Sequence, residues 1–108
     1  MSITINIYYT AVNGASRAFA EEMSALGIAD AIRAEDGNLC YEYFFPMNDP
    51  ETVLLIDSWR DQAALDKHHE SNMMAQIAAL REKYDLHMKV ERYVSADESP
   101  EDEKFIRS

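Results

Sequence analysis

The chain has 108 residues, 47% of them hydrophobic, and a formal net charge of -10 at pH 7. This length indicates one domain with a modest core, because a short chain buries a smaller fraction of its surface than a long one. The excess of carboxylates argues against binding to nucleic acid or to an anionic membrane surface, since both attract Lys and Arg. The single cysteine, Cys40, excludes an internal disulfide framework. No apolar run approaches the roughly 20 residues that span a bilayer, and we predict a cytoplasmic protein.

The first third of the chain predicts a strand followed by a helix. Residues 2–9 alternate apolar and polar side chains, which is typical of a half-buried strand. Residues 15–33 have helical spacing, with a bend or break expected near Gly27 because glycine weakens a helix by roughly 1 kcal/mol relative to alanine. Gly37 can take the left-handed conformation that ends a helix at low cost.

The rest of the chain adds three strands and a pair of helices. Residues 39–45 and 53–60 are predicted strands joined by a short loop, so they should pair as an antiparallel hairpin. Residues 86–94 form the last predicted strand. The order strand, helix, strand, strand, helix pair, strand is that of the ferredoxin-like βαββαβ fold of the α+β class. We expect this domain over residues 1–95 and an acidic tail over residues 96–108.

The helix pair follows Trp59 and contains the candidate chemistry. Asp61 is expected to cap the first helix and Ser71 the second, because short side-chain oxygens accept hydrogen bonds from the free N–H groups of a first turn. The second helix should begin at Met73. Helical spacing places His68 on the apolar face of the first helix, so its side chain is expected to point into the protein.

Both faces of the predicted sheet carry apolar residues. Residues 53–56 are apolar in succession, and aromatic side chains fall on both faces of the strand over residues 39–45. Two helices can cover only one side of a four-stranded sheet, and the other side would be a large exposed apolar patch. We therefore predict a homodimer in which two sheets meet face to face. Phe105 and Ile106 in the tail dock on the partner subunit or are disordered, and the sequence leaves both open.

Two stretches resemble the antibiotic biosynthesis monooxygenase family, including its quinol monooxygenase-like members. Residues 34–42 read AEDGNLCYE, and residues 57–68 read DSWRDQAALDKH. In that family a helix ends in an acidic turn with Gly, a strand begins Leu-x-Tyr/Phe-Glu, and a Trp closes the third strand before a helix with an inward His. The resemblance covers residues 3–94. It implies a dimeric α+β barrel that oxidises a small aromatic substrate, a quinol or polyphenol, with dioxygen and with no metal, flavin or haem cofactor.

The resemblance also implies a pocket between the sheet and the helix pair. His68 is the predicted catalytic base, because histidine has the unperturbed pKa nearest neutrality. Its neighbour His69 is a second candidate contact. Asn6 would orient a substrate oxygen if its face of the first strand looks toward the helices. The predicted substrate-binding residues are Asn6, Tyr41, Trp59, His69, Met73 and Met74.

Other functions remain open at this point. His68 and His69 point about 100° apart on a helix, which does not suit one metal ion, and we predict no metal site. Some members of the family resemble haem-degrading enzymes, but the position of their Trp corresponds to His68 here. The remaining alternative is a dimer of the same fold that binds or isomerises a small molecule without oxygenase turnover. An isomerase of phosphorylated substrates would need basic residues in its pocket, and the nearby cations are Arg60, Lys67 and Arg81.

Overall fold

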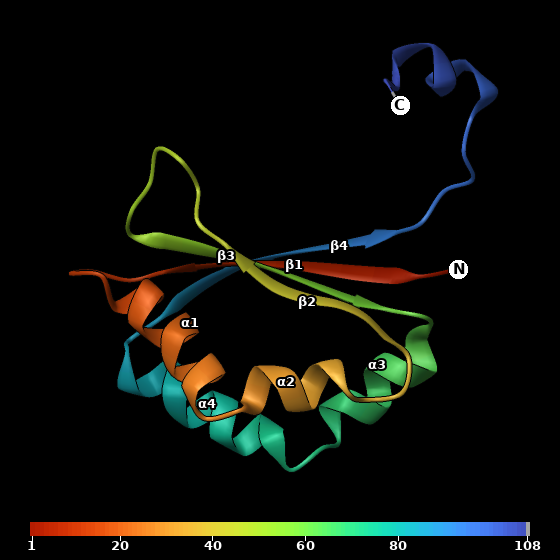
Figure 1. The fold of residues 1–108 in the computed structure, drawn as a ribbon. Helices are drawn as coiled ribbons and strands as arrows, with labels where there is room; N and C mark the ends of the chain where they lie inside the picture. Colours follow the sequence, from red (N-terminus) through yellow and green to blue (C-terminus); the bar gives the residue numbers. More distant parts are fainter. Residues whose placement is uncertain (108) are drawn as a thin grey trace.

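The computed structural model describes residues 1–107 as a four-stranded antiparallel sheet with its four α-helices on one face (Figure 1). The strand order is β2-β3-β1-β4. This is the predicted ferredoxin-like α+β fold. Ser108, the last residue of the predicted tail, lies outside the described residues. The elements are β1 (Ile3–Thr10), α1 (Ala15–Ala25), α2 (Ile28–Arg33), β2 (Asn38–Phe44), β3 (Thr52–Trp59), α3 (Gln62–His69), α4 (Met73–Lys83), β4 (His87–Val94) and a 3-10 helix, η1 (Pro100–Phe105).

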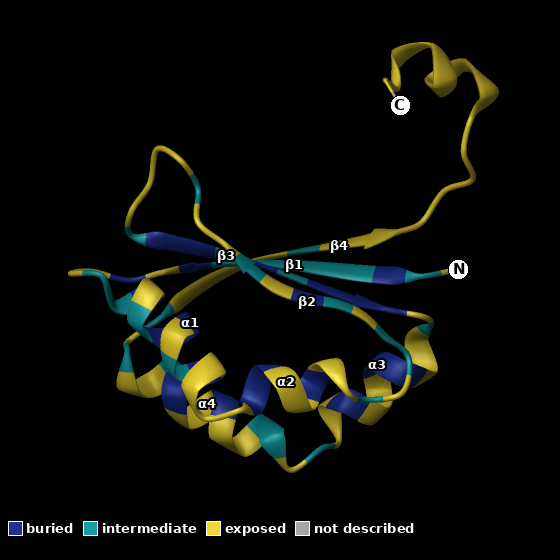
Figure 2. Cartoon of the chain, viewed as in Figure 1, coloured by how far each residue is buried: buried dark blue, intermediate teal, exposed yellow. Residues whose placement is uncertain are grey.

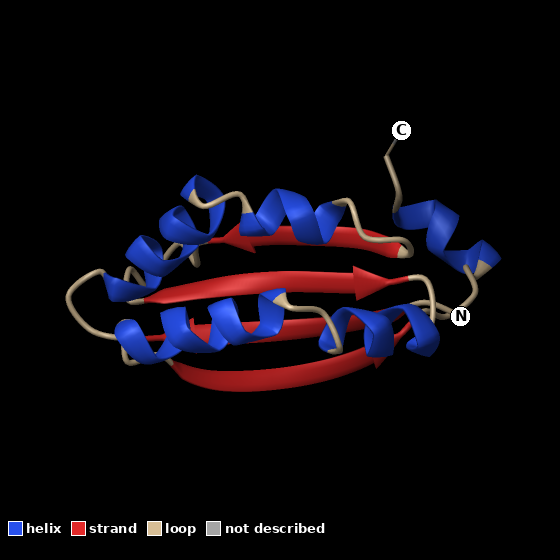
Figure 3. Cartoon of the chain, turned by 90° about the horizontal axis from the view of Figure 1, so that it is seen from below, coloured by secondary structure: helices blue, strands red, loops and turns tan. Residues whose placement is uncertain are grey.

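The helices form two rows across the sheet. Figure 3 shows α1 followed by α2 in one row, and α4 and α3 in the other. The predicted break between α1 and α2 is confirmed, because Gly27 takes a left-handed conformation with φ of 76°. α3 continues directly from the end of β3, and α4 leads back toward the start of β4. The second row therefore carries the predicted base, His68, which belongs to α3.

The alternation of β1 decides which side chains meet the helices. Ile3 lies opposite Trp59 and Tyr9 lies opposite Val53 on the neighbouring strand β3. All four of these side chains are buried, and the ring of Tyr9 packs 5.0 Å from the ring of Phe19 on α1. Figure 2 shows the buried residues gathered between the sheet and the helices. The largest fully buried side chains are Trp59, Phe19, Met23, Ile32, Leu55, Leu65 and Val53.

One of the two predicted helix caps is confirmed. Asp61 Oδ1 accepts a hydrogen bond from the backbone N–H of Ala64 at 2.9 Å. The prediction for Ser71 is wrong, because its hydroxyl is buried without a hydrogen-bond partner in residues 1–107. The backbone carbonyl of Ser71, not its side chain, accepts the N–H of Met74 at 3.2 Å. A backbone turn therefore starts α4 where a side-chain cap was expected.

The other face of the sheet has no helix over it. The β2–β3 loop and the C-terminal segment both extend on this side in Figure 1. Register places Tyr8, Leu54 and Phe44 side by side on this face across β1, β3 and β2. In the C-terminal segment, η1 has no buried residue, and Phe105 is 86% exposed. No helix within residues 1–107 is long and apolar enough to cross a membrane.

Candidate active site

A cavity of about 380 Å³ lies between the sheet and the row formed by α3 and α4. Its floor includes Ile5 and Ile7 of β1 and Leu55 of β3, and its helical wall includes Leu65 and Ile77. These side chains are apolar, and the volume falls at the small end of the roughly 300–1,000 Å³ typical of small-molecule sites. This part of the cavity therefore suits the apolar body of a small ligand.

His68 lies on the wall of this cavity with its imidazole only 3% exposed. Its Nδ1 is 3.1 and 3.2 Å from the two carboxylate oxygens of Glu35. An ionised carboxylate can only accept hydrogen bonds, so Nδ1 must carry the hydrogen in this contact. In the neutral imidazole the lone pair is then on Nε2, to which no hydrogen bond is found in residues 1–107. Glu35 thus fixes the tautomer in which Nε2 can accept a proton.

Trp59 supports His68 from the side of the sheet. The two rings are stacked, with centroids 4.7 Å apart and planes inclined by 26°. Trp59 was predicted to bind substrate, but it is fully buried and does not line the cavity. It instead packs behind the histidine. Its indole Nε1 donates a hydrogen bond to Asp57 Oδ1 at 2.7 Å. Glu35 and Trp59 together hold the imidazole in one orientation.

Asp57 is a buried carboxyl group that lines the same cavity. Burial raises its pKa from 3.8 to about 6, while the nearby His68 and the hydrogen bond from Trp59 oppose the rise. The direction follows because an apolar environment disfavours the charged form of an acid. The cavity therefore contains a carboxyl group that holds its proton to a higher pH than an exposed aspartate does.

Both histidines of the adjacent pair reach the cavity, although His69 is the more exposed. The centroids of the two imidazole rings are 5.6 Å apart. Partial burial, with a smaller effect from His68, lowers the pKa of His69 below 6.5. His69 is therefore placed to contact a ligand at the outer part of the site, while His68 lies at its buried side.

The other predicted binding residues separate into two groups. Tyr41 and Met74 line the cavity. The hydroxyl of Tyr41 pairs with that of Tyr43 at 3.1 Å, and burial raises the pKa of both phenols. Met73 instead lines a separate hollow with Glu35 and Lys67, because consecutive helical residues point in different directions.

Asn6, another predicted binding residue, lies on the opposite face of the sheet from this site. It lies opposite Ile56 of β3 and Glu91 of β4, on the sheet face without helices. Side chains alternate along a strand, and Ile5 and Ile7 occupy the helix side. Asn6 was expected to orient a substrate oxygen only if it faced the helices. It faces away from them. Its Oδ1 is buried without a hydrogen-bond partner in the described part of the chain.

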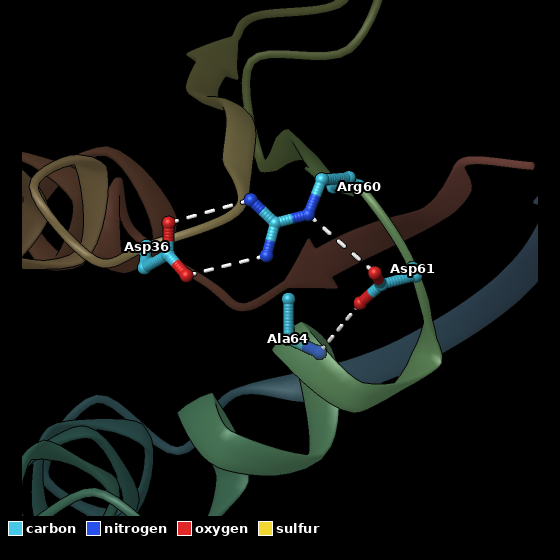
Figure 4. A network of polar contacts seen from close by, with 4 residues as sticks. All are labelled: Asp36, Arg60, Asp61 and Ala64. Carbon is cyan, nitrogen blue, oxygen red and sulfur yellow. Dashed lines mark hydrogen bonds and ion pairs between the residues drawn. The ribbon is translucent and has the colours of Figure 1, made fainter.

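A surface network holds the turn that carries Glu35 against the start of α3. Arg60 donates from Nη1 and Nη2 to the two carboxylate oxygens of Asp36 at 3.3 and 3.2 Å, and from Nε to Asp61 at 3.4 Å (Figure 4). The backbone N–H of Arg60 also donates to the carbonyl of Gly37 at 2.7 Å. Asp61 caps α3, so this network links the Glu35 turn to the helix that bears His68.

Gly37 is required where this turn meets α3. Its φ is +87°, and a Cβ at this position would lie 2.5 Å from Cβ of Ala64. Only glycine combines this backbone conformation with so close an approach. The contact brings the Glu35 turn near enough for the carboxylate to reach His68.

Four charged residues also belong to the site, and the sequence interpretation did not assign them to it: Glu35, Asp57, Arg81 and Arg92. The signal for Asp57 was its place in the alternation of β3, two residues before Trp59, on the side that faces the helices. Of the three cations considered, Arg81 lines the cavity, whereas Arg60 pairs with Asp36 at the surface and Lys67 lines a separate hollow. No group of three His, Cys, Asp or Glu side chains in residues 1–107 is arranged to hold a metal ion.

Comparison with known sequences identifies the family. The family described as antibiotic biosynthesis monooxygenase matches residues 2–80 of this chain. The chain belongs to this family. A Bacillus subtilis protein named "Putative monooxygenase YcnE" is 36% identical over 39 residues, which are 36% of this chain and 41% of that protein. The matched segment thus spans about two fifths of this curated relative.

Several solved structures are similar to this chain in fold. PA3566 from Pseudomonas aeruginosa is 27% identical, with a TM-score of 0.75 over 89% of this chain and 95% of that one. Rv0793 from Mycobacterium tuberculosis is 22% identical, with a TM-score of 0.75 over 92% and 99%. SnoaB from Streptomyces nogalater, described as a cofactor-independent oxygenase, is 14% identical, with a TM-score of 0.72 over 92% and 97%. The last two likenesses concern the fold alone.

Proposed function

We propose that this member of the antibiotic biosynthesis monooxygenase family is a cofactor-independent oxygenase that oxidises a quinol or polyphenol with dioxygen, with His68 as the base. The observation that carries the proposal is the pairing of His68 Nδ1 with Glu35 at the wall of an apolar cavity. This pairing leaves Nε2 as the proton acceptor on the cavity side. The description of SnoaB as a cofactor-independent oxygenase supports the same reaction class.

The proposed reaction needs few protein groups. Nε2 of His68 takes the proton of a phenolic hydroxyl, and the electron-rich phenolate reduces dioxygen. A bond forms between oxygen and a ring carbon that bears hydrogen, ortho or para to the hydroxyl, and that carbon loses its hydrogen as a proton. The O–O bond then breaks, so that one oxygen atom stays on the ring of the quinone product and the other leaves as water. The substrate supplies the electrons, and the apolar walls exclude bulk water from the intermediates.

The proposed enzyme is a homodimer that buries the sheet face opposite the helices. Tyr8, Leu54 and Phe44 lie side by side on this face, and Tyr93 of β4 lies on the same face farther along the sheet, opposite Thr4 of β1. Phe44 and Tyr93 are exposed in the single chain. An apolar surface of this kind is typical of a protein interface. A second copy, packed sheet against sheet, accounts for the aromatic residues on this face.

A second candidate function is a dimer that binds or isomerises a small molecule without consuming dioxygen. Arg81 favours this alternative, because it gives the cavity a cation that can hold an anionic substrate. In that case His68 would still move a proton. The two candidates differ in one observable quantity, the amount of dioxygen consumed per substrate.

The test is dioxygen uptake by the metal-free protein with a panel of hydroquinones, catechols and naphthols. The proposal predicts uptake above the spontaneous rate and one atom of ¹⁸O in the product when ¹⁸O₂ is supplied. Binding of a panel compound without uptake would overturn the oxygenase proposal and support the second candidate.

A further inference from the structure

Two arginines line the cavity in a chain that carries a strong negative charge. Arg81 comes from α4 and Arg92 from the edge strand β4. The chain has 20 acidic and 10 basic residues, so an arginine has many carboxylates available to it. Neither Arg81 nor Arg92 forms an ion pair with any carboxylate in residues 1–107. These two guanidinium groups line one cavity without a paired carboxylate in the described part of the chain, so both are available to an anionic ligand.

The contacts of these arginines leave most of their donors free. Arg81 Nη1 lies 3.5 Å from the weak acceptor Sδ of Met88, and Arg92 Nη2 donates to Oε1 of Gln62. A guanidinium has five N–H donors in a fixed fork. Each side chain therefore keeps donors that can bind a planar carboxylate or a phosphate.

The arginines lie at the open side of the cavity and His68 lies at its closed side. Along β4 the lining residues Met88 and Val90 are 41% and 54% exposed, whereas His68 is 3% exposed. The cavity therefore opens along β4, the strand that carries Arg92. A ligand that enters from this side meets the cations first and the imidazole last.

Asp57 adds an electrostatic reason for one orientation of the ligand. This carboxyl group is close enough to His68 for the histidine to influence its pKa. It also accepts the hydrogen bond of Trp59, so its negative charge lies in the inner part of the site. A ligand anion is repelled from a carboxylate and attracted by guanidinium groups. The charged end of the ligand should thus remain near β4, with its neutral end beside the histidine.

We propose that the cavity binds a hydroxylated aromatic molecule that carries an anionic substituent, a carboxylate or a phosphate, held by Arg81 and Arg92 with the hydroxyl directed toward His68. The aromatic nature of the ligand rests on the proposed function, whereas the anion requirement rests on the two arginines. The substituent supplies binding energy at the mouth of the cavity and fixes the position of the ring.

Calorimetric titration under anaerobic conditions tests this proposal without any turnover. The probes are 1-naphthol, 1-hydroxy-2-naphthoate and 1-naphthyl phosphate, so that the neutral compound is matched by a carboxylate and a phosphate. We expect one of the two anions to bind at least about tenfold more tightly than 1-naphthol, because charge-assisted bidentate hydrogen bonds are strong. The preferred anion identifies the substituent. Equal affinity for all three probes would overturn the proposal.

Matched charge-removing variants locate the anion. Arg81→Gln and Arg92→Gln should each weaken binding of the preferred anion about tenfold and leave 1-naphthol unchanged. Arg17→Gln is the control, because Arg17 packs over the ring of Phe45 at 3.7 Å and does not line the cavity. Anion binding that both cavity variants retain in full would refute the assignment.

Two further results separate this proposal from the oxygenase proposal. In the unmodified protein, anion affinity should fall as salt is raised while 1-naphthol affinity stays constant, and this measurement does not depend on the folding of a variant. Arginine-dependent anion binding without dioxygen uptake would support the anion site and refute the oxygenase. Uptake with subsaturating anionic phenols that Arg81→Gln and Arg92→Gln leave unchanged would support the oxygenase and refute the anion site.

Discussion

Both carboxylate oxygens of Glu35 lie within hydrogen-bond distance of Nδ1 of His68, at 3.1 and 3.2 Å. The contact joins the turn before β2 to the last turn of α3. A carboxylate in this position orients the imidazole and fixes its tautomer, as it does for the histidine ligands of metals. Glu35 is therefore a positioning residue in the proposed reaction, while His68 acts on the substrate.

The variant Glu35→Gln should lower the turnover number about 10- to 100-fold and leave ligand affinity unchanged, because the imidazole keeps its place but loses its charged partner. ¹⁵N NMR should show Nδ1–H as the main tautomer in the unmodified protein and a mixture in Glu35→Ala. Glu70→Gln, at the exposed end of α3, is the control. Full turnover and an unchanged tautomer in both Glu35 variants would contradict this role.

The sequence was sufficient to predict the side chains that regular elements orient. Helical spacing correctly turned His68 inward, and the alternation of the strands predicted the sheet and its antiparallel pairing. The same alternation already placed Asn6 opposite to Ile5 and Ile7, so its position away from the helices followed from a pattern visible in the sequence. Met73 and Met74 could not be separated in advance, because the angular phase of α4 depends on how it packs on the sheet.

The pairing of Glu35 with His68 could not be predicted from the sequence. It depends on the approach of Gly37 to Ala64, a contact between a turn and a helix that no periodic pattern encodes. Arg92 was missed because β4 is an edge strand and its alternation does not show which side is covered. Arg81 was considered only as a nearby cation, because the side of α4 that faces the sheet depends on packing. Local patterns thus determined the elements, and packing between them determined the site.

Gly37→Ala should destabilise the fold and weaken the Glu35–His68 contact. The new Cβ meets Cβ of Ala64 at 2.5 Å while φ stays at +87°. We expect a loss of roughly 1–3 kcal/mol in the free energy of unfolding, measured with urea. Gly14→Ala is the matched control, since φ is +74° there but nothing lies within 4 Å of the added Cβ. Equal losses in the two variants would show that the contact with Ala64 contributes nothing.

Asp57→Asn should stabilise the protein at pH 7. The folded-state pKa of Asp57 is raised from 3.8 to about 6, so the folded protein binds more protons than the unfolded chain between these values. The contribution of this group to stability is thus lost as pH rises from about 4 to about 6, and the full penalty is present above pH 6. The rise in pKa corresponds to at most about 3 kcal/mol.

The check on Asp57 is the free energy of unfolding of both proteins at pH 4 and pH 7. The difference between Asp57→Asn and the unmodified protein should be small at pH 4 and favour the variant at pH 7. The amide oxygen of asparagine can still accept the hydrogen bond from Trp59. A difference that does not change with pH would show that Asp57 has an ordinary pKa.

Phe44→Glu should convert the proposed dimer to monomers. The side chain lies on the exposed sheet face, and a carboxylate there must lose its hydration if a second copy covers it. Sedimentation velocity should give twice the mass of one chain for the unmodified protein and the mass of one chain for the variant. Leu26→Glu, at the exposed end of α1 on the helix side, should stay dimeric. A monomeric unmodified protein would rule out the dimer.

The most direct test of the central claim compares dioxygen uptake by His68→Ala and by His87→Ala with that of the unmodified protein. His87 is an exposed residue of β4 outside the cavity, so its removal controls for the loss of an imidazole. We predict that His68→Ala loses at least about 100-fold in rate, that added imidazole restores part of it, and that His87→Ala keeps full activity. Uptake by a folded His68→Ala variant at the rate of the unmodified protein would contradict the assignment of His68 as the base.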